Sequence, residues 1–188
     1  TESSDTGYLS QPTPGAANPA TLTGLIDEVG WSVEHGFFET PFELTLTCPT
    51  PGATIRYTTD GSEPTANSGI ITAAPIRIAR STVVRAAAFR EGWKPSRSST
   101  RTFLFLDDVV TQTTAAAVQS GWPATWSGTA ADYGLDPRVV GPGGTDAFKG
   151  KYTRSLKADL QSLPTLSIVA PVADLFGPQG LYSNPEPH

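Results

Sequence analysis

The chain of 188 residues has little of what most catalytic and metal sites require. It contains one cysteine, Cys48, and two histidines, His35 and His188. These are too few for a zinc cluster, a disulfide framework or a cysteine–histidine dyad, and neither histidine is placed as the base of a serine triad. Cys48 falls in an alternating apolar run, which favours a small buried side chain. We therefore expect no enzyme activity, no cofactor and no bound metal.

Basic charge and long apolar runs are also scarce. The chain has 13 Lys and Arg against 18 Asp and Glu, a net charge of -5. This balance offers no basic patch for a phosphate backbone, so it argues against nucleic-acid binding. No segment reaches the roughly 18–20 consecutive apolar residues of a membrane helix, so we expect no transmembrane segment in this chain.

Methionine is absent, and we interpret the chain as an excerpt of a longer protein. Low lysine together with abundant Thr, Ser, Gly and Pro is typical of exported bacterial proteins. The composition therefore predicts an extracytoplasmic location, in the periplasm or at the cell surface.

What the chain does contain favours β structure. With 18 Gly, 17 Pro and 16% charged residues, it is rich in turn formers and poor in helix formers. Apolar residues alternate with polar ones over 42–48, 53–58, 75–78, 82–89 and 98–106, the two-residue period of strands. Val84, Ala86 and Ala88 are the predicted inward set of one strand. Short strands at this spacing, separated by turn residues, predict an all-β sandwich.

The regions on either side are less regular. Residues 1–30 are predicted to be an extended leader, residues 31–106 the sandwich, and residues 107–188 an irregular arm with one or two short helices. One helix is expected to start at Asp136-Pro137, and another to run from Phe148 to Leu160 with apolar residues at every fourth position. Residues 165–169 are predicted to form a short strand, and the Asp107-Asp108 pair a solvated strand end. The long arms are expected to dock on partner proteins.

One motif offers oxygen ligands but is predicted to be a turn. Asp60-Gly61-Ser62-Glu63 lacks the twelve-residue pattern of a calcium-binding EF-hand loop. An aspartate that caps backbone amides, followed by a glycine at positive φ, explains it as a tight turn.

The same region carries a family resemblance. Residues 51–65 read PGATIRYTTDGSEPT and residues 84–96 read VRAAAFREGWKPS. This part of the chain, about residues 31–106, closely resembles the chitobiase/β-hexosaminidase C-terminal domain family. The resemblance implies an immunoglobulin- or fibronectin-like β-sandwich appended to bacterial extracellular proteins, and it implies a fold rather than catalysis.

Both flanks carry further resemblances. Residues 11–18, QPTPGAAN, are similar to the exit of lamin-tail domains, and residues 163–169, LPTLSIV, to the opening of spore-coat-protein-H-like kinase domains. The second resemblance implies that residues 107–188 include the start of a truncated kinase-like domain, whose nucleotide and metal ligands would lie beyond His188.

These observations predict a non-catalytic extracytoplasmic module that acts as a subunit or spacer in a larger assembly. A carbohydrate-binding module is the alternative, because aromatic rings form platforms for sugars; polysaccharide is then the partner. Another alternative is an excerpt of a kinase-like protein without its catalytic part. The candidate contacts with a partner or glycan are Trp93, Trp122, Trp126 and Tyr182.

Overall fold

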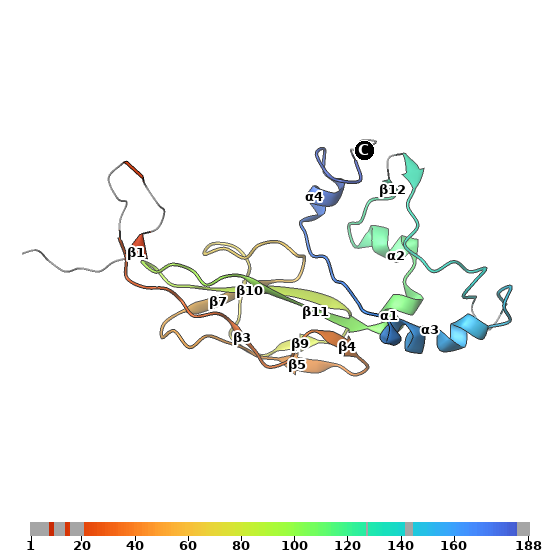
Figure 1. Cartoon of the computed structure of the whole chain (residues 1–188), viewed down its shortest axis with the longest axis horizontal. Coiled ribbons are helices and arrows are strands. Elements are labelled where there is room, and N and C mark those ends of the chain that lie inside the picture. Colours follow the sequence, from red (N-terminus) through yellow and green to blue (C-terminus); the bar gives the residue numbers. More distant parts are fainter. Residues whose placement is uncertain (1–7, 10–13, 16–20, 127, 142–144, 184–188) are drawn as a thin grey trace, which may run out of the picture. The chain divides into compact units, whose positions relative to one another are not determined.

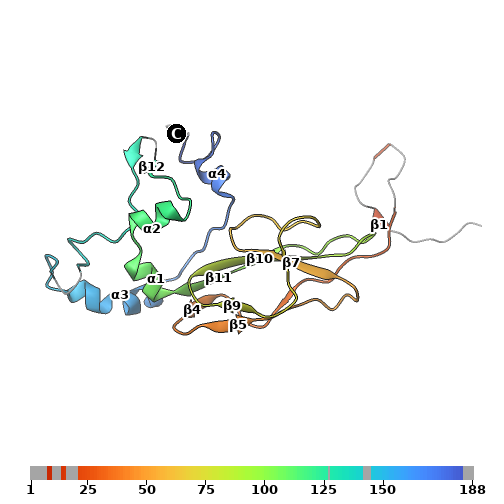
Figure 2. The same cartoon turned by 180° about the vertical axis from the view of Figure 1, so that it is seen from behind.

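A computed structural model describes residues 8–9, 14–15, 21–126, 128–141 and 145–183. Figures 1 and 2 show the helices and strands of the chain from two opposite sides. The chain divides into two compact units. The first unit comprises Thr1–Glu34, Phe42–Arg77 and Val83–Arg101, and the second His35–Pro41, Ile78–Thr82 and Thr102–His188.

Strands make up most of the regular structure. They are β1 (Tyr8–Leu9), β2 (Thr21–Leu22), β3 (Gly30–Trp31), β4 (Gly36–Phe38), β5 (Phe42–Leu44), β6 (Leu46–Thr47), β7 (Thr54–Thr58), β8 (Ile70–Ile71), β9 (Ile76–Ile78), β10 (Thr82–Phe89), β11 (Ser99–Phe105), β12 (Thr125–Trp126) and β13 (Thr129–Ala130). The main sheet has the order β4–β11–β10–β7–β8, and the two-stranded pairs are β1–β2, β3–β6, β5–β9 and β12–β13. The predicted all-β, immunoglobulin-like class is confirmed.

The sheet core follows the alternation in the sequence. β10 pairs antiparallel with β7, and Ala88 lies opposite Ile55. The predicted inward residues Val84, Ala86 and Ala88 have no exposed surface. On β11, Phe103 and Phe105 are buried, and both approach the Phe38 ring, with centroid distances of 5.7 and 6.2 Å. Small alanines on a central strand leave room for close packing on its faces.

The Asp60 turn has the structure that the sequence predicts. The Asp60 carboxylate accepts hydrogen bonds from the Ser62 hydroxyl at 2.6 Å and the Ser62 backbone N–H at 3.0 Å, and Gly61 has a φ of 80°. These hydrogen bonds lower the pKa of Asp60 below its usual value of 3.8. Arg85 of β10 holds the turn by pairing with Glu63 and donating to the Gly61 carbonyl at 3.4 Å.

Residues 23–29, which belong to the predicted leader, pack into the first unit. Thr23 N–H donates to the Gly92 carbonyl at 2.8 Å, and Lys94 N–H donates to the Gly24 carbonyl at 2.9 Å, in a parallel arrangement. Ile26 and Val29 are each only 6% exposed. The predicted turn at Pro14-Gly15 is present, with a Gly15 φ of 78°, whereas residues 10–13 and 16–20 lie outside the described part.

The second unit carries the helices. Its described residues form α1 (Leu106–Thr111), α2 (Thr114–Gln119), α3 (Lys151–Ser162) and α4 (Val172–Phe176), more than the one or two helices predicted. α3 confirms the helix predicted over Phe148 to Leu160, but it starts only after Gly150, whose φ of 72° is left-handed. Among the described residues, no helix is long and apolar enough to cross a membrane.

Three local predictions in this unit are wrong. Asp136-Pro137 starts a single turn rather than a helix: the Asp136 carboxylate caps the Arg138 N–H at 2.8 Å and pairs with the Arg138 side chain, but the turn is not continued. Residues 165–169 form no strand in the described chain, since a strand requires a neighbour for its ladder. Asp107 and Asp108 lie in the first turn of α1, where carboxylates are favoured by the helix dipole, rather than at a strand end.

Candidate functional site

Five aromatic side chains of the second unit form a closed ring of contacts. This aromatic cluster consists of Trp122, Trp126, Tyr133, Phe176 and Tyr182. Tyr133 meets both tryptophans edge to face, with centroid distances of 6.0 and 5.2 Å. Tyr182 stacks on Trp126 at 6.3 Å and on Phe176 at 5.2 Å, and Phe176 closes the ring against Trp122 at 5.8 Å. Aromatic pairs favour both geometries, so these contacts hold this part of the chain together.

Turns and short elements bring these side chains together. α2 ends in a turn with Gly121 at a φ of 95°, and Trp122 N–H donates back to the Ala117 carbonyl at 3.2 Å. Tyr182 N–H similarly donates to the Leu175 carbonyl of α4 at 2.8 Å. Each turn therefore folds an aromatic side chain back beside the helix that precedes it.

Tyr133 is the polar centre of the aromatic cluster. Its hydroxyl accepts from the Trp126 Nε1–H at 3.1 Å and donates to the Pro123 carbonyl at 2.8 Å. The tyrosine thus satisfies the indole nitrogen and one backbone carbonyl at once. Because the hydroxyl is fully engaged, Tyr133 positions its neighbours rather than offering a free donor.

The sequence-predicted contact residues divide between the two units. Trp122, Trp126 and Tyr182 meet in the aromatic cluster, with Trp122 40% and Tyr182 49% exposed. Trp93 belongs to the first unit, where the Arg90 guanidinium lies 4.4 Å from its ring centroid and Gly24 lies against the ring. The sequence analysis missed Tyr133 and Phe176, since no spacing links them to the tryptophans.

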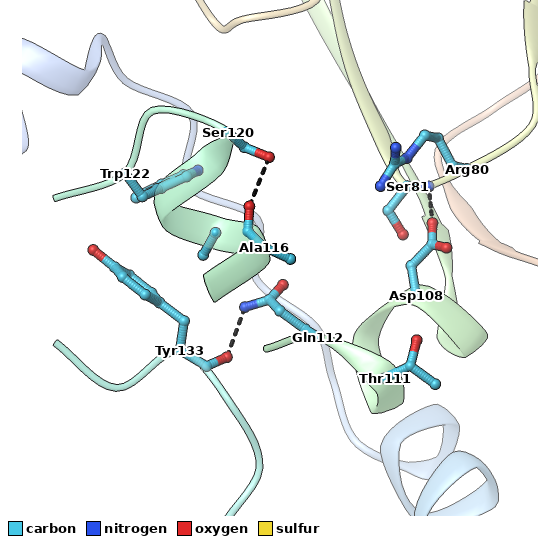
Figure 3. A pocket seen from close by; sticks show the side chains of 10 residues that line it. Arg80, Ser81, Asp108, Thr111, Gln112, Ala116, Ser120, Trp122 and Tyr133 are labelled. Carbon is cyan, nitrogen blue, oxygen red and sulfur yellow. Dashed lines mark hydrogen bonds between the residues drawn. The ribbon is translucent and has the colours of Figure 1, made fainter. Parts of the chain in front are cut away.

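A cavity of about 540 Å³ lies beside the aromatic cluster; we call it the α2 cavity (Figure 3). All of its lining residues lie in the second unit. They are Arg80, Ser81, Asp108, Thr111, Gln112, Ala116, Ala117, Ser120, Trp122 and Tyr133. Figure 3 shows Arg80, Ser81 and Asp108 on one side, Trp122 and Tyr133 on the other, and the residues of α2 between them.

The polar groups of the α2 cavity are held by the backbone. Asp108 accepts from the Ser81 N–H at 2.5 Å, and Gln112 Nε2–H donates to the Tyr133 carbonyl at 2.8 Å. The hydroxyls of Ser81, Thr111 and Ser120 donate to backbone carbonyls at 3.2, 2.6 and 3.0 Å. No lining hydroxyl is therefore paired with a base that would activate it as a nucleophile. The arrangement suits binding by hydrogen bonds and ring contact.

A buried carboxylate organises a second loop of this unit. Asp146 is 7% exposed and accepts from the N–H groups of Phe148 at 2.8 Å and of Gly141 and Gly150 at 3.2 Å. Burial works to raise the pKa of Asp146, but the hydrogen bonds outweigh it and place the pKa below the usual 3.8. Its Oδ2 also accepts from the Thr153 hydroxyl of α3 at 3.3 Å, so Asp146 joins its own loop to the helix and has a structural role. Within the described ranges, no three His, Cys, Asp or Glu side chains are grouped to hold a metal ion.

The strand order and the buried alternation define the strand-rich part of the chain as an immunoglobulin-like β-sandwich domain. Residues 33–100 match the family model of the chitobiase/beta-hexosaminidase C-terminal domain, so this part of the chain carries a domain of that family. No curated protein and no solved structure gave a significant match. The aromatic cluster lies wholly outside the matched segment, and the α2 cavity lies mostly outside it.

Proposed function

We propose that the chain is a non-catalytic, extracytoplasmic interaction module that docks on a partner protein through residues 163–172 of its C-terminal arm. The observation that carries the proposal is the exposure of apolar side chains there. Leu166 is 84% and Ile168 79% exposed, and Leu163 is 62% exposed. Apolar side chains gathered in this way typically mark an interaction surface.

One side chain of this segment is held by its own chain while its neighbours are exposed. Residues 165–169 belong to no helix or strand of the described chain. Ser167 turns toward its own chain, with its hydroxyl 2.7 Å from the hydroxyl of Thr102, while the apolar side chains of Leu166 and Ile168 stay exposed. Exposed apolar side chains on both sides of an anchored residue suit docking against an apolar surface of a partner protein.

Site-specific cross-linking tests this proposal. A photo-cross-linking amino acid at Ile168 should capture a partner protein in the producing cell, and one at Ser162, at the end of the neighbouring α3, should capture much less. Sedimentation of the purified chain identifies self-association as the source of a cross-link. No cross-link from Ile168 to any other protein would contradict the proposal.

Carbohydrate binding is a second candidate function, because the structure gathers three of the four predicted contact residues beside a cavity with polar and aromatic walls. It predicts that the intact chain binds oligosaccharides. In this proposal Trp122 and the α2 cavity contribute, and Trp93 does not, because Arg90 and Gly24 already contact its ring.

The interpretation of residues 107–188 as the start of a kinase-like domain stays a prediction. Because that resemblance places the nucleotide ligands beyond His188, it predicts no ATP binding by this chain; ATP binding measured by calorimetry would contradict both proposals above. The extracytoplasmic location is likewise proposed on composition, and fractionation of the producing cell with an antibody to the chain tests it.

A further inference from the structure

We propose that the α2 cavity binds a neutral saccharide, with Arg80, Asp108 and Gln112 as hydrogen-bonding partners and Trp122 as the apolar wall. This inference rests on the second candidate function above, to which it adds a location and a ligand class. The volume of the α2 cavity, about 540 Å³, lies within the range of about 300–1,000 Å³ that is usual for small-molecule sites.

The wall of the α2 cavity offers ring surface. Trp122 is 40% exposed although it belongs to the aromatic cluster. Tyr133 and Phe176 both meet it at steep angles, 62° and 79°, so neither ring is stacked on the indole. The C–H face of a sugar ring can pack on such an indole, because the indole is flat and apolar and its neighbours fix its position.

The opposite side of the α2 cavity offers donors and acceptors together. Among the described residues, the Arg80 guanidinium makes no ion pair or hydrogen bond, so its N–H groups are available as donors. Asp108 uses one carboxylate oxygen for Ser81 N–H and keeps acceptor capacity on the other. Gln112 donates its amide N–H to Tyr133 and keeps its amide oxygen as an acceptor. A hydroxyl both donates and accepts, so adjacent hydroxyls on a ring match this set.

The charges that line the α2 cavity determine which hydroxyl-bearing ligands it favours. Among the described residues that line it, Arg80 is the one cation and Asp108 the one anion. An anionic ligand such as a phosphate or a uronate would gain from Arg80 and be repelled by Asp108, because like charges in a shared site disfavour each other. A ligand without net charge meets no such penalty, and its binding should depend little on salt.

The indole N–H signals of the intact chain provide a direct test. The chain has four tryptophans, so a ¹⁵N spectrum resolves up to four indole signals, which single Trp→Phe variants assign. We expect neutral oligosaccharides, with trimers of N-acetylglucosamine, glucose and xylose as probes, to shift the Trp122 signal and to leave Trp31 and Trp93 unchanged. A trimer of galacturonic acid serves as the anionic comparison.

Matched variants test the polar residues. Arg80→Ala should weaken binding about tenfold or more, the effect of losing a charge-assisted hydrogen bond. Arg138→Ala is the control, since Arg138 is an exposed arginine of the same unit whose side chain pairs with Asp136 outside the cavity. Asp108→Asn, which keeps an oxygen for Ser81 N–H, should weaken binding less than Arg80→Ala, and Asp159→Asn on α3 should have no effect.

Four other results would overturn the proposal, each in a distinct way. A shift confined to Trp93 or Trp126 would place the sugar elsewhere and leave carbohydrate binding intact. A response to the galacturonic acid trimer alone, weakened by salt, would overturn the neutral ligand class. Equal affinities of the Arg80 and Arg138 variants would remove the polar assignment. No shift with any probe would overturn both this inference and the carbohydrate function, leaving the protein-docking proposal untouched.

Discussion

Gly24 lies so close to the Trp93 ring that a larger side chain does not fit at position 24. A Cβ atom built on Gly24 would lie 2.6 Å from Trp93 Cζ3 and 2.9 Å from Cε3. The ring cannot simply move away, because the Arg90 guanidinium lies 4.4 Å from its centroid. Gly24→Ala should therefore overpack the site where residues 23–26 pair with residues 92–94.

The magnitude follows from two opposing effects. Overpacking a well-filled site costs about 1–3 kcal/mol. Replacing glycine by alanine restricts the unfolded chain and returns about 0.4–1 kcal/mol. We expect Gly24→Ala to lower the free energy of unfolding by about 1–2 kcal/mol. Gly134→Ala is the control, because its added Cβ meets its nearest neighbour at 3.6 Å, an ordinary contact, and the change should be neutral or slightly stabilising.

A double-mutant cycle isolates the contact. Urea unfolding followed by far-ultraviolet circular dichroism avoids dependence on tryptophan fluorescence. In a Trp93→Ala background the steric conflict is gone, so Gly24→Ala should lose most of its effect, with a coupling of about 1–3 kcal/mol. An equal effect of Gly24→Ala in both backgrounds would refute the reasoning, because the destabilisation would then come from the backbone of residue 24 and not from the ring.

Three further changes test other contacts. Asp146 has a lowered pKa, so its contribution to stability is fully present above the unfolded value of about 3.9 and is lost as the pH falls through the native pKa. In urea titrations, Asp146→Asn should therefore flatten the loss of stability that the native chain shows as the pH falls below about 4. Thr50→Val should lower the free energy of unfolding by about 1–3 kcal/mol. The buried Thr50 hydroxyl accepts from the Asp27 N–H and donates to the Asp27 carboxylate, both at 2.8 Å, and valine can do neither. An unchanged urea midpoint would contradict this prediction. Tyr133→Phe should leave the Pro123 carbonyl and the Trp126 Nε1–H without their partner and lower the free energy of unfolding by about 1–2 kcal/mol. Hydrogen exchange of the Trp126 indole N–H should become faster. An unchanged exchange rate would show that the Tyr133 hydroxyl does not protect it.

Strand positions were predictable wherever both periodicity and turn chemistry were local. The alternation in residues 82–89 correctly predicts Val84, Ala86 and Ala88 as buried, because successive side chains of a strand face opposite sides. The Asp60 turn was equally accessible, since its hydrogen bonds join residues two positions apart. The strand predicted for residues 165–169 failed because a strand also needs a neighbour, which no local pattern reveals.

The candidate site, likewise, was predictable from the sequence only in part. Sequence reasoning selected Trp122, Trp126 and Tyr182 as exposed aromatic residues, but not the contacts between them. The rings of Tyr133 and Phe176 join the tryptophans through turns at Gly121 and after α4, and no periodic spacing relates these positions. Arg80 and Gln112 were not identified at all, because surface arginine and glutamine side chains carry no signal until a cavity lies between them.

The sequence by itself determined the class of fold and argued against several classes of site. Scarce cysteine and histidine and the acidic balance are properties of composition, and the absence of long apolar runs is a property of residue order; neither depends on how the chain folds. Only the tertiary structure decided which aromatic rings meet, that residues 23–29 pack into the first unit, and that Leu166 and Ile168 are exposed. Contacts between distant residues depend on the path of the whole backbone, whereas strand periodicity and turns depend on neighbours in the chain.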